Sequence, residues 1–225
     1  MHGGDVGDAE GALPLIWFAG RRWTVKTSQV PVGPGPNLFS AERVSVDSAG
    51  QLHLTIEHVP SGWSCAEVVA QGEFGYGSYR WRVASELNAQ HAPAVLGLFL
   101  WSDEPAQAHR ELDIEFSRWG EPARPVVGSF TVPNAPPSDS YRFPAGAGES
   151  EHTLTWSQGR VAFRSRFGTV RSEWVLEGAG VPSPGGGVGP RINLWLFRGQ
   201  APGGPLAVTI GDFSYDPAPP RPTRE

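Results

Sequence analysis

Short segments in which apolar and polar side chains alternate recur along the chain, and turn-forming Gly, Pro, Asn and Ser residues separate them. A period of two is typical of β-strands buried on one face, whereas apolar residues at helical spacing are nearly absent. The pattern therefore predicts an all-β fold, either a sandwich or a jelly roll. The expected strands are residues 22–28, 43–47, 51–59, 65–71, 77–85, 94–101, 111–119, 125–132, 152–158, 160–167, 170–177, 192–199 and 206–215.

The alternation is most regular in "HRELDIEFSRWG", residues 109–120. Successive side chains of a strand point to opposite faces, so three acids share one face and three large apolar residues share the other. We expect the apolar set to enter the core and the carboxylates to lie side by side outside it. The acids are Glu111, Asp113 and Glu115, and the apolar residues are Leu112, Ile114 and Phe116.

Three acids in five residues have two interpretations. Solvated strand faces and sheet edges carry charges that prevent aggregation. No lysine stands among these acids, however, and Asp and Glu are poor strand formers. In the functional interpretation, which we favour, one carboxylate attacks a glycosidic bond or activates water, and the other donates a proton. A central Asp113 would help to keep one glutamate protonated and would orient the other.

The spacing alone does not choose the stereochemical outcome. Positions i and i+4 of a strand are about 13 Å apart at Cα. Retaining glycosidases need carboxyl groups about 5 Å apart, and inverting enzymes need about 6.5 to 9.5 Å. A concave sheet with two long side chains leaning together would close the gap.

"ELDIEF" resembles the Glu-x-Asp-x-Glu motif of glycoside hydrolase family 16, in the form found in bacterial 1,3-1,4-β-glucanases (lichenases). The flanking segments resemble family strands in the same order, so the similarity covers roughly residues 15–216. These segments are "CAEVVA", "FGYGSYRWRV", "AVLGLFLW", "HTLTWSQGRVAFRS", "RINLWLFRG" and "AVTIGDFSY". The resemblance implies a concanavalin A-like β-jelly-roll of two curved antiparallel sheets, with a concave glycan cleft. It also implies retaining hydrolysis, with Glu111 as nucleophile, Asp113 as its helper and Glu115 as acid/base.

Aromatic residues near the acids are candidate sugar platforms. Phe99 and Trp101 share one face of the segment 94–101, and leucines occupy the other face. We expect the aromatic face to line the cleft, although burial between two sheets is the alternative. Strand alternation also places Trp119 on the cleft side.

The resemblance adds further substrate-binding candidates. Glu67 in "CAE" matches a cleft residue, and Asn193 and Trp195 match a sugar-contacting Asn-x-Trp in a late strand. Without the resemblance, Trp195 would be assigned to the core, because "INLWLF" is apolar on both faces. The proline-rich segment 31–40 reads as a rigid loop bordering the cleft, with Asn37 as its sugar contact.

No cofactor is expected for catalysis. Gly50 and Asp212 match positions where relatives hold a structural calcium, through a backbone carbonyl and a carboxylate. Calcium takes six to eight oxygen ligands, so two candidates leave the presence of a site open.

Several residues depart from the family pattern, so the identity of the substrate does not transfer. His109 and Arg110 stand where lichenases have Trp-Asp, and Val69 replaces an arginine. Cys65 is the single cysteine, which excludes an intrachain disulfide, and we expect a buried, inert thiol. Arg110 or Arg118 near the cleft would favour an acidic or sulfated glycan, although a plain surface role for them is favoured.

Charge and length limit the partners and the domain organisation. The net charge is −5, and the 18 basic residues form no stripe, so nucleic acid is not an expected partner. No segment approaches the roughly 20 apolar residues of a membrane helix. We expect a flexible leader at 1–14, one jelly-roll domain at 15–216 and a Pro-rich tail at 217–225, in a monomer. No clear signal peptide precedes the domain, although relatives act mostly outside the cell.

Taken together, the sequence predicts an endo-acting retaining hydrolase of a β-linked polysaccharide such as a β-glucan. Two alternatives stay open. One is a non-catalytic carbohydrate-binding module on the same fold, which the altered His109–Arg110 pair keeps in play. The other is a transglycosylase, which would use the same residues.

Overall fold

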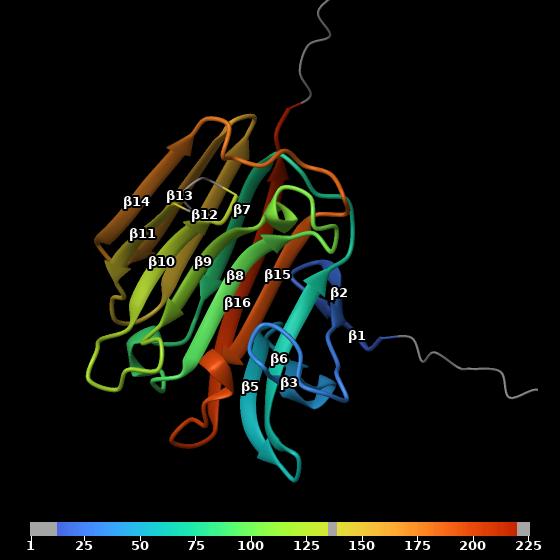
Figure 1. Ribbon diagram of the computed structural model, residues 1–225, viewed down its shortest axis with the longest axis vertical. Helices are drawn as coiled ribbons and strands as arrows, with labels where there is room; N and C mark the ends of the chain where they lie inside the picture. The colour runs from blue at the N-terminus through green and yellow to red at the C-terminus, as the bar shows by residue number, and fades with distance from the viewer. Residues whose placement is uncertain (1–12, 135–138, 220–225) are drawn as a thin grey trace, which may run out of the picture.

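The computed structural model describes residues 13–134 and 139–219, which form two β-layers packed face to face (Figure 1). The first layer has the strand order β11-β10-β9-β8-β15-β6-β2-β1. Its strands are β1 (Leu15–Phe18), β2 (Arg21–Val25), β6 (Gly62–Ala70), β8 (Ala94–Trp101), β9 (Leu112–Ser117), β10 (Val127–Val132), β11 (Asp139–Pro144) and β15 (Gly189–Leu196).

The second layer has the order β14-β13-β12-β7-β16-β5-β4. Its strands are β4 (Val44–Val46), β5 (Leu52–Val59), β7 (Gly77–Val83), β12 (Ser150–Ser157), β13 (Arg160–Phe167), β14 (Val170–Glu177) and β16 (Leu206–Pro217). The end of β5 pairs with the start of β6, which joins the two layers along one side. The pairing is antiparallel throughout the described strands, except that β3 (Leu38–Phe39) runs parallel to β6. The expected all-β jelly-roll sandwich is confirmed.

Four short 3₁₀ helices connect strands in the described residues: η1 (Ala41–Arg43), η2 (Leu87–Ala89), η3 (Ala108–Arg110) and η4 (Phe197–Gly199). Over these same residues, no helix has the length and apolar character needed to cross a membrane. Most of the expected leader and the end of the expected tail, residues 1–12 and 220–225, lie outside the described residues.

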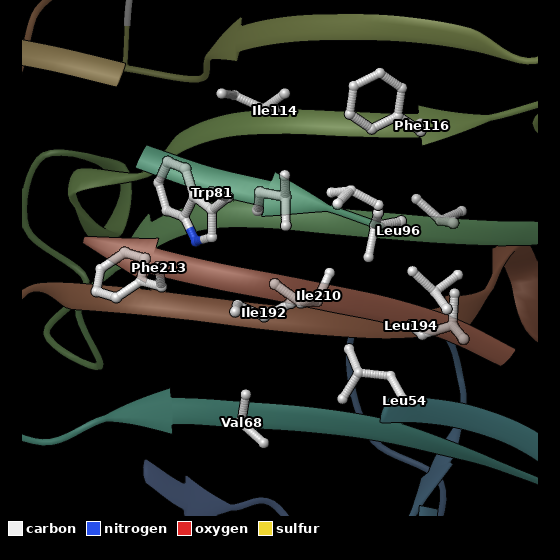
Figure 2. Close-up of a cluster of buried hydrophobic side chains, with 14 of the residues drawn as sticks. Leu54, Val68, Trp81, Leu96, Ile114, Phe116, Ile192, Leu194, Ile210 and Phe213 are labelled. Carbon is white, nitrogen blue, oxygen red and sulfur yellow. The ribbon is translucent and has the colours of Figure 1, made fainter. Parts of the chain in front are cut away.

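The core lies between the layers and follows the period-two pattern of the sequence. Figure 2 shows Ile114 and Phe116 of β9, Leu96 of β8 and Leu194 of β15 pointing toward side chains of the other layer, such as Trp81. These side chains are fully buried. The inward apolar face of β9 fixes its register, because a slip of one residue would bring the acids into the core.

Most strand predictions agree with the structure, and β8, β13 and β14 have the predicted bounds. The pattern missed β1, β3 and β11. β3 has only two residues, and β11 has the sequence "DSYRFP", which lacks a run of apolar or β-branched residues. Short edge elements of this kind acquire their conformation from the neighbouring strand rather than from their own propensity.

His152 of β12 is a buried polar residue in this core, directly behind the acidic strand. Its Nε2 bonds the Ser150 hydroxyl at 2.9 Å and its Nδ1 bonds the Ser165 hydroxyl at 2.9 Å. The imidazole lies 4.7 Å from the Phe116 ring, between ring centroids. Desolvation lowers the pKa of His152 from 6.5 to about 3, so the folded protein holds this ring neutral.

We expect His152 to contribute to acid unfolding. Below pH 6.5 the unfolded chain binds a proton on His152 that the folded protein excludes until about pH 3, so stability falls over this interval. The loss over the whole interval is up to roughly 5 kcal/mol. Denaturant titrations from pH 7 to pH 4 would give the free energy of unfolding as a function of pH. In His152→Gln its slope should correspond to about one proton fewer taken up on unfolding than in the wild type. His58→Gln, at an exposed position of β5, is the control, and an equal reduction there would contradict the assignment.

Candidate active site

Glu111, directly before β9, and Asp113 and Glu115 within it lie on the outer face of the first layer, as the alternation predicted. Glu115 pairs with Gly97 of β8, Gly97 pairs with Asn193 of β15, and Asn193 pairs with Glu67 of β6. Directly paired residues project on the same face of a sheet. A cross-strand row therefore carries Glu67, Asn193 and Glu115 on one surface, with Gly97 between the Asn193 amide and β9.

These residues line a cleft of about 580 Å³. Eight of the residues singled out from the sequence lie in its lining: Glu67, Phe99, Trp101, Glu111, Asp113, Glu115, Asn193 and Trp195. Gly97 lies there too, on the face of Phe99 and Trp101. Three further lining residues were not predicted: Lys26, Asp103 and Arg191. The aromatic face of β8 thus belongs to the cleft, and the proline-rich loop borders it through Gly33 and Pro34.

Two predicted sugar contacts do not line this cleft. Asn37 is 3% exposed, and its Nδ2 donates to the carbonyls of Pro34 (2.8 Å) and Leu196 (2.9 Å). It therefore holds the loop from beneath instead of presenting its amide to a ligand, which corrects the sequence-based assignment. Trp119 lies beyond the end of β9 and contacts Trp195 edge-on, with ring centroids 6.5 Å apart.

Glu67 is the centre of a buried ion cluster in the cleft wall. The carboxylate is 2% exposed and lies 3.1 Å from Lys26 Nζ and 3.6 Å from Arg191 Nη1. Arg191 also pairs with Asp103 at 2.8 Å. The two cations and the two partner acids are therefore balanced. Alternation could have placed Arg191 in the cleft, since it shares a strand face with Asn193 and Trp195. No local pattern in the sequence indicates Lys26.

Burial shapes the protonation of the acidic row. Desolvation raises the pKa of Glu111 to about 7, opposed by a hydrogen bond with the Asp113 carboxyl and by the charge of His109. Desolvation, and then the charge of Glu111, raise the pKa of Glu115 to about 7. Burial and both neighbouring glutamates raise the pKa of Asp113 well above its usual range. Of the three, Glu111 alone has neighbouring groups that oppose the rise in its pKa.

His109 covers one face of Trp101 at the rim of the cleft. The two rings stack 4.1 Å apart at 10°, and His109 Nδ1 bonds the Ser102 carbonyl at 2.9 Å. The segment from Gln107 to Arg110 reaches this position through positive φ angles of 49° to 60°, which non-glycine residues seldom adopt. One face of Trp101 is thus occupied by the protein itself.

Arg110 and Arg118, weighed from sequence as possible contacts for an acidic glycan, lie outside the cleft lining. The Arg110 guanidinium pairs with Glu104 at 2.9 Å. The Arg118 guanidinium donates to the carbonyls of Pro122 (3.2 Å) and Asn88 (3.1 Å). Both guanidinium groups hold loops in place. Arg110 is 7% exposed, so it is buried rather than on the surface, and neither arginine pairs with an acid of the row in the described residues.

Cys65 is buried and free, and burial raises the pKa of its thiol to about 12, as expected for an inert thiol. The proposed calcium ligands lie near each other. Leu52 of β5 pairs with Ile210 of β16 in an antiparallel ladder, and Gly50 is two residues before Leu52 while Asp212 is two residues after Ile210, so both lie beyond the same end of that pair. No group of three His, Cys, Asp or Glu side chains with metal-binding geometry occurs in residues 13–134 and 139–219. Calcium binding stays a prediction that would need backbone and water oxygens.

Gly97 lets the Asn193 amide lie flat in the cleft floor, because a Cβ at this position would stand 2.4 Å from Asn193 Oδ1. We expect Gly97→Ala to displace the amide and to raise KM for a glycan about tenfold, which is the scale of one lost hydrogen bond. Steady-state kinetics and thermal unfolding would measure the two effects. Gly204→Ala, whose Cβ meets only His91 at 3.7 Å, is the control. An unchanged KM in Gly97→Ala would contradict this role.

No protein-family model matches the sequence, and no curated protein matches it. Solved structures do match. The β-glucanase of Bacillus licheniformis superposes with a TM-score of 0.64 at 17% identity, over 86% of this chain and 91% of that one. A family 16 endo-glucanase from Bacteroides ovatus gives 0.63 at 15% identity, over 86% and 94%. The chain has the fold of family 16 glycoside hydrolases.

A third structure with the family 16 fold is an immunostimulatory antigen of Mycobacterium tuberculosis, described as a pseudo-β-1,3-glucanase. It superposes with a TM-score of 0.65 at 17% identity, over 86% of this chain and 89% of that one. The family 16 fold is thus found both in glucanases and in a protein described as a pseudo-β-1,3-glucanase. Function must therefore be argued from the residues in the cleft.

Proposed function

We propose that this protein is an endo-acting, retaining glycoside hydrolase that cleaves a β-linked polysaccharide. The observation that carries the proposal is the row of three carboxyl groups in the cleft. Burial raises the pKa of each, and the charge of neighbouring glutamates raises the pKa of Asp113 and Glu115 further. Such a row holds at least one proton at neutral pH, which is what a carboxyl acid catalyst needs. Crowded buried acids destabilise a protein, so a role in catalysis explains why they are present.

In the proposed reaction Glu115 donates its proton to the glycosidic oxygen while the Glu111 carboxylate attacks the anomeric carbon. The bond to the leaving sugar breaks and a glycosyl ester of Glu111 forms. Glu115, now ionised, takes a proton from water, which attacks the same carbon and releases Glu111. Asp113 stays protonated and donates a hydrogen bond to Glu111, which orients the nucleophile. Each of the two displacements inverts the configuration of the anomeric carbon, so the product has the same configuration as the substrate.

Aromatic and balanced polar groups support binding of neutral sugars next to the acids. Phe99, Trp101 and Trp195 offer ring faces or edges to pyranose rings. Asn193 Oδ1 is a buried acceptor that receives no hydrogen bond from residues 13–134 and 139–219. The cations Lys26 and Arg191 already have carboxylate partners. A sugar carboxylate or sulfate would have to break those pairs while facing the acidic row, so neutral residues fit this part of the cleft.

The test is release of reducing ends from a panel of neutral β-glucans and galactans, beginning with mixed-linkage β-glucan. A structural neighbour from Bacteroides ovatus was solved with a product and is described as acting on that polymer. NMR of the first product should show the β-anomer before mutarotation. A first product with the α-anomer would exclude retention, and a folded protein that degrades no member would exclude hydrolysis of those glycans.

A binding module is the second candidate, because a structural neighbour with this fold is described as a pseudo-glucanase. Binding of a panel member without any release of reducing ends would favour it. Transglycosylation uses the same steps with a sugar in place of water. Longer products that increase with acceptor concentration would identify it.

A further inference from the structure

A second pocket, of about 360 Å³, lies beyond the acidic strand and is lined by Trp119, Glu121, Arg124, Arg142, Phe197 and Arg198. Three of the six residues are arginines, and two are aromatic. Trp119 and Phe197 meet edge to face, with centroids 5.4 Å apart at 84°. We call this the arginine pocket.

The arginine pocket lies past the carboxyl-terminal ends of β9 and β15 and extends to β11, which is across β9 from the cleft. Glu115 pairs with Ser129 of β10, and Ser129 pairs with Arg142 of β11. Arg142 therefore projects on the same face as Glu115, two strands away, which corresponds to about 10 Å between Cα atoms. Trp119 joins the two regions, because it lines the arginine pocket and contacts Trp195 of the cleft. A glycan crossing β9 at the acids would reach both.

The charges of the two regions differ. In the arginine pocket, Glu121 pairs with Arg124 at 3.1 Å, which balances one positive charge. Arg142 and Arg198 form no ion pair with any residue in the described part of the chain, and Arg198 lies over the Phe197 ring at 4.9 Å. Two guanidinium groups therefore remain available, whereas the cations of the cleft are paired with Glu67 and Asp103.

We propose that the arginine pocket is a subsite for a sugar residue that carries a fixed negative charge, either a sulfate ester or a carboxylate. A guanidinium binds both groups through two parallel N–H···O bonds, and an indole face accommodates the ring of the sugar. The glycan would thus present neutral residues on the β8 side of the cleaved bond and an anionic residue on the β11 side. The placement of the glycan relative to the three acids rests on the proposed function.

The experiment measures binding to the Glu111→Gln protein by calorimetry, so that cleavage does not interfere. The ligands are a short sulfated β-galactan oligosaccharide, the same oligosaccharide after desulfation, and a glucuronate-containing β-glucan oligosaccharide. We expect a charged ligand to bind at least about tenfold more tightly than the neutral one, with the sulfate and carboxylate arms identifying the anion. Each of Arg142→Ala and Arg198→Ala should weaken that ligand about tenfold, the scale of one charge-assisted interaction.

Two comparisons separate a defined subsite from general attraction of anions. Arg171→Ala removes an exposed arginine of β14 on the other layer and should leave affinity unchanged. Arg142→Lys keeps the positive charge but cannot donate two parallel N–H bonds, so its affinity for the charged ligand should lie between those of the wild type and Arg142→Ala. Equal affinity for charged and neutral ligands, or an equal effect of Arg171→Ala, would overturn the proposal.

The outcomes also distinguish this inference from the proposed function. Arginine-dependent binding of a charged ligand by a wild-type protein that cleaves nothing would leave the subsite standing and reject the hydrolase. Cleavage of neutral glucans with no effect of Arg142→Ala or Arg198→Ala, in binding or turnover, would support the hydrolase and reject the subsite.

Discussion

Glu111→Gln is expected to lower kcat on a cleavable β-glycan by about 10³-fold or more, with little change in the unfolding transition. The amide cannot attack the anomeric carbon, so no glycosyl-enzyme forms. Removing the buried charge relieves repulsion within the acidic row, so the fold should be kept. Reducing-end assays together with thermal unfolding would measure both effects. Glu173→Gln, an exposed acid of β14 paired with Arg164, is the matched control.

Glu115→Gln should give a different pattern, because its loss removes proton donation and not the nucleophile. On a natural polysaccharide kcat should fall about 10²- to 10⁴-fold, the usual contribution of general acid catalysis. With an aryl glycoside whose leaving group needs no proton, the first step should persist, and the glycosyl-enzyme should accumulate. Azide should rescue Glu115→Ala to give a β-glycosyl azide, whereas rescue of Glu111→Ala should give the α-anomer. The reverse pattern of anomers would exchange the two roles.

The pH dependence of activity is expected to be bell-shaped with its maximum near neutral pH. Below the maximum Glu111, whose pKa burial raises to about 7, takes up a proton and no longer attacks. Above it Glu115, whose pKa is also raised to about 7, loses the proton that the leaving oxygen requires. The limbs report the titration of the coupled row rather than of either residue alone. A flat profile from pH 5 to pH 9 would contradict the assignment of both groups.

Asp113→Asn separates activity from stability. An amide can still donate to Glu111, but it donates less strongly than a protonated carboxyl group, and we expect kcat to fall about ten- to a hundredfold. Stability should change in the opposite direction. The pKa of Asp113 is raised in the folded protein, so the folded state holds a proton that the unfolded chain releases above pH 3.8. Wild-type stability therefore decreases as pH rises from there through the raised pKa.

Asp113→Asn removes this decrease. We expect the variant to be more stable than the wild type by roughly 1 to 3 kcal/mol at pH 8 and nearly equal to it at pH 4. Denaturant titrations at the two pH values would measure the difference. If the variant is less stable than the wild type at pH 8, then the Asp113 side chain stabilises the fold, which would contradict this prediction.

The sequence by itself determined the strands, their faces and the acidic row. Side-chain alternation in a strand is a local property, so "ELDIEF" was sufficient to place Leu112 in the core and Glu111 outside it. The same reasoning assigned the aromatic face of β8, since Phe99 and Trp101 alternate with leucines that are fully buried. Period two decides such placements without knowledge of the partner strands.

The tertiary structure alone decided which side chains meet across strands. Glu67 pairs with Lys26 and Arg191, which are 41 and 124 positions away, and nothing local to any of the three residues indicates this cluster. Asn37 was predicted as a sugar contact because it lies in a rigid proline-rich loop bordering the cleft, yet its amide donates to two backbone carbonyl groups. Arg142 lies near Glu115 only through the pairing of β9, β10 and β11. Strand order and register are non-local, and they set both the charge balance of the cleft and the position of the arginine pocket.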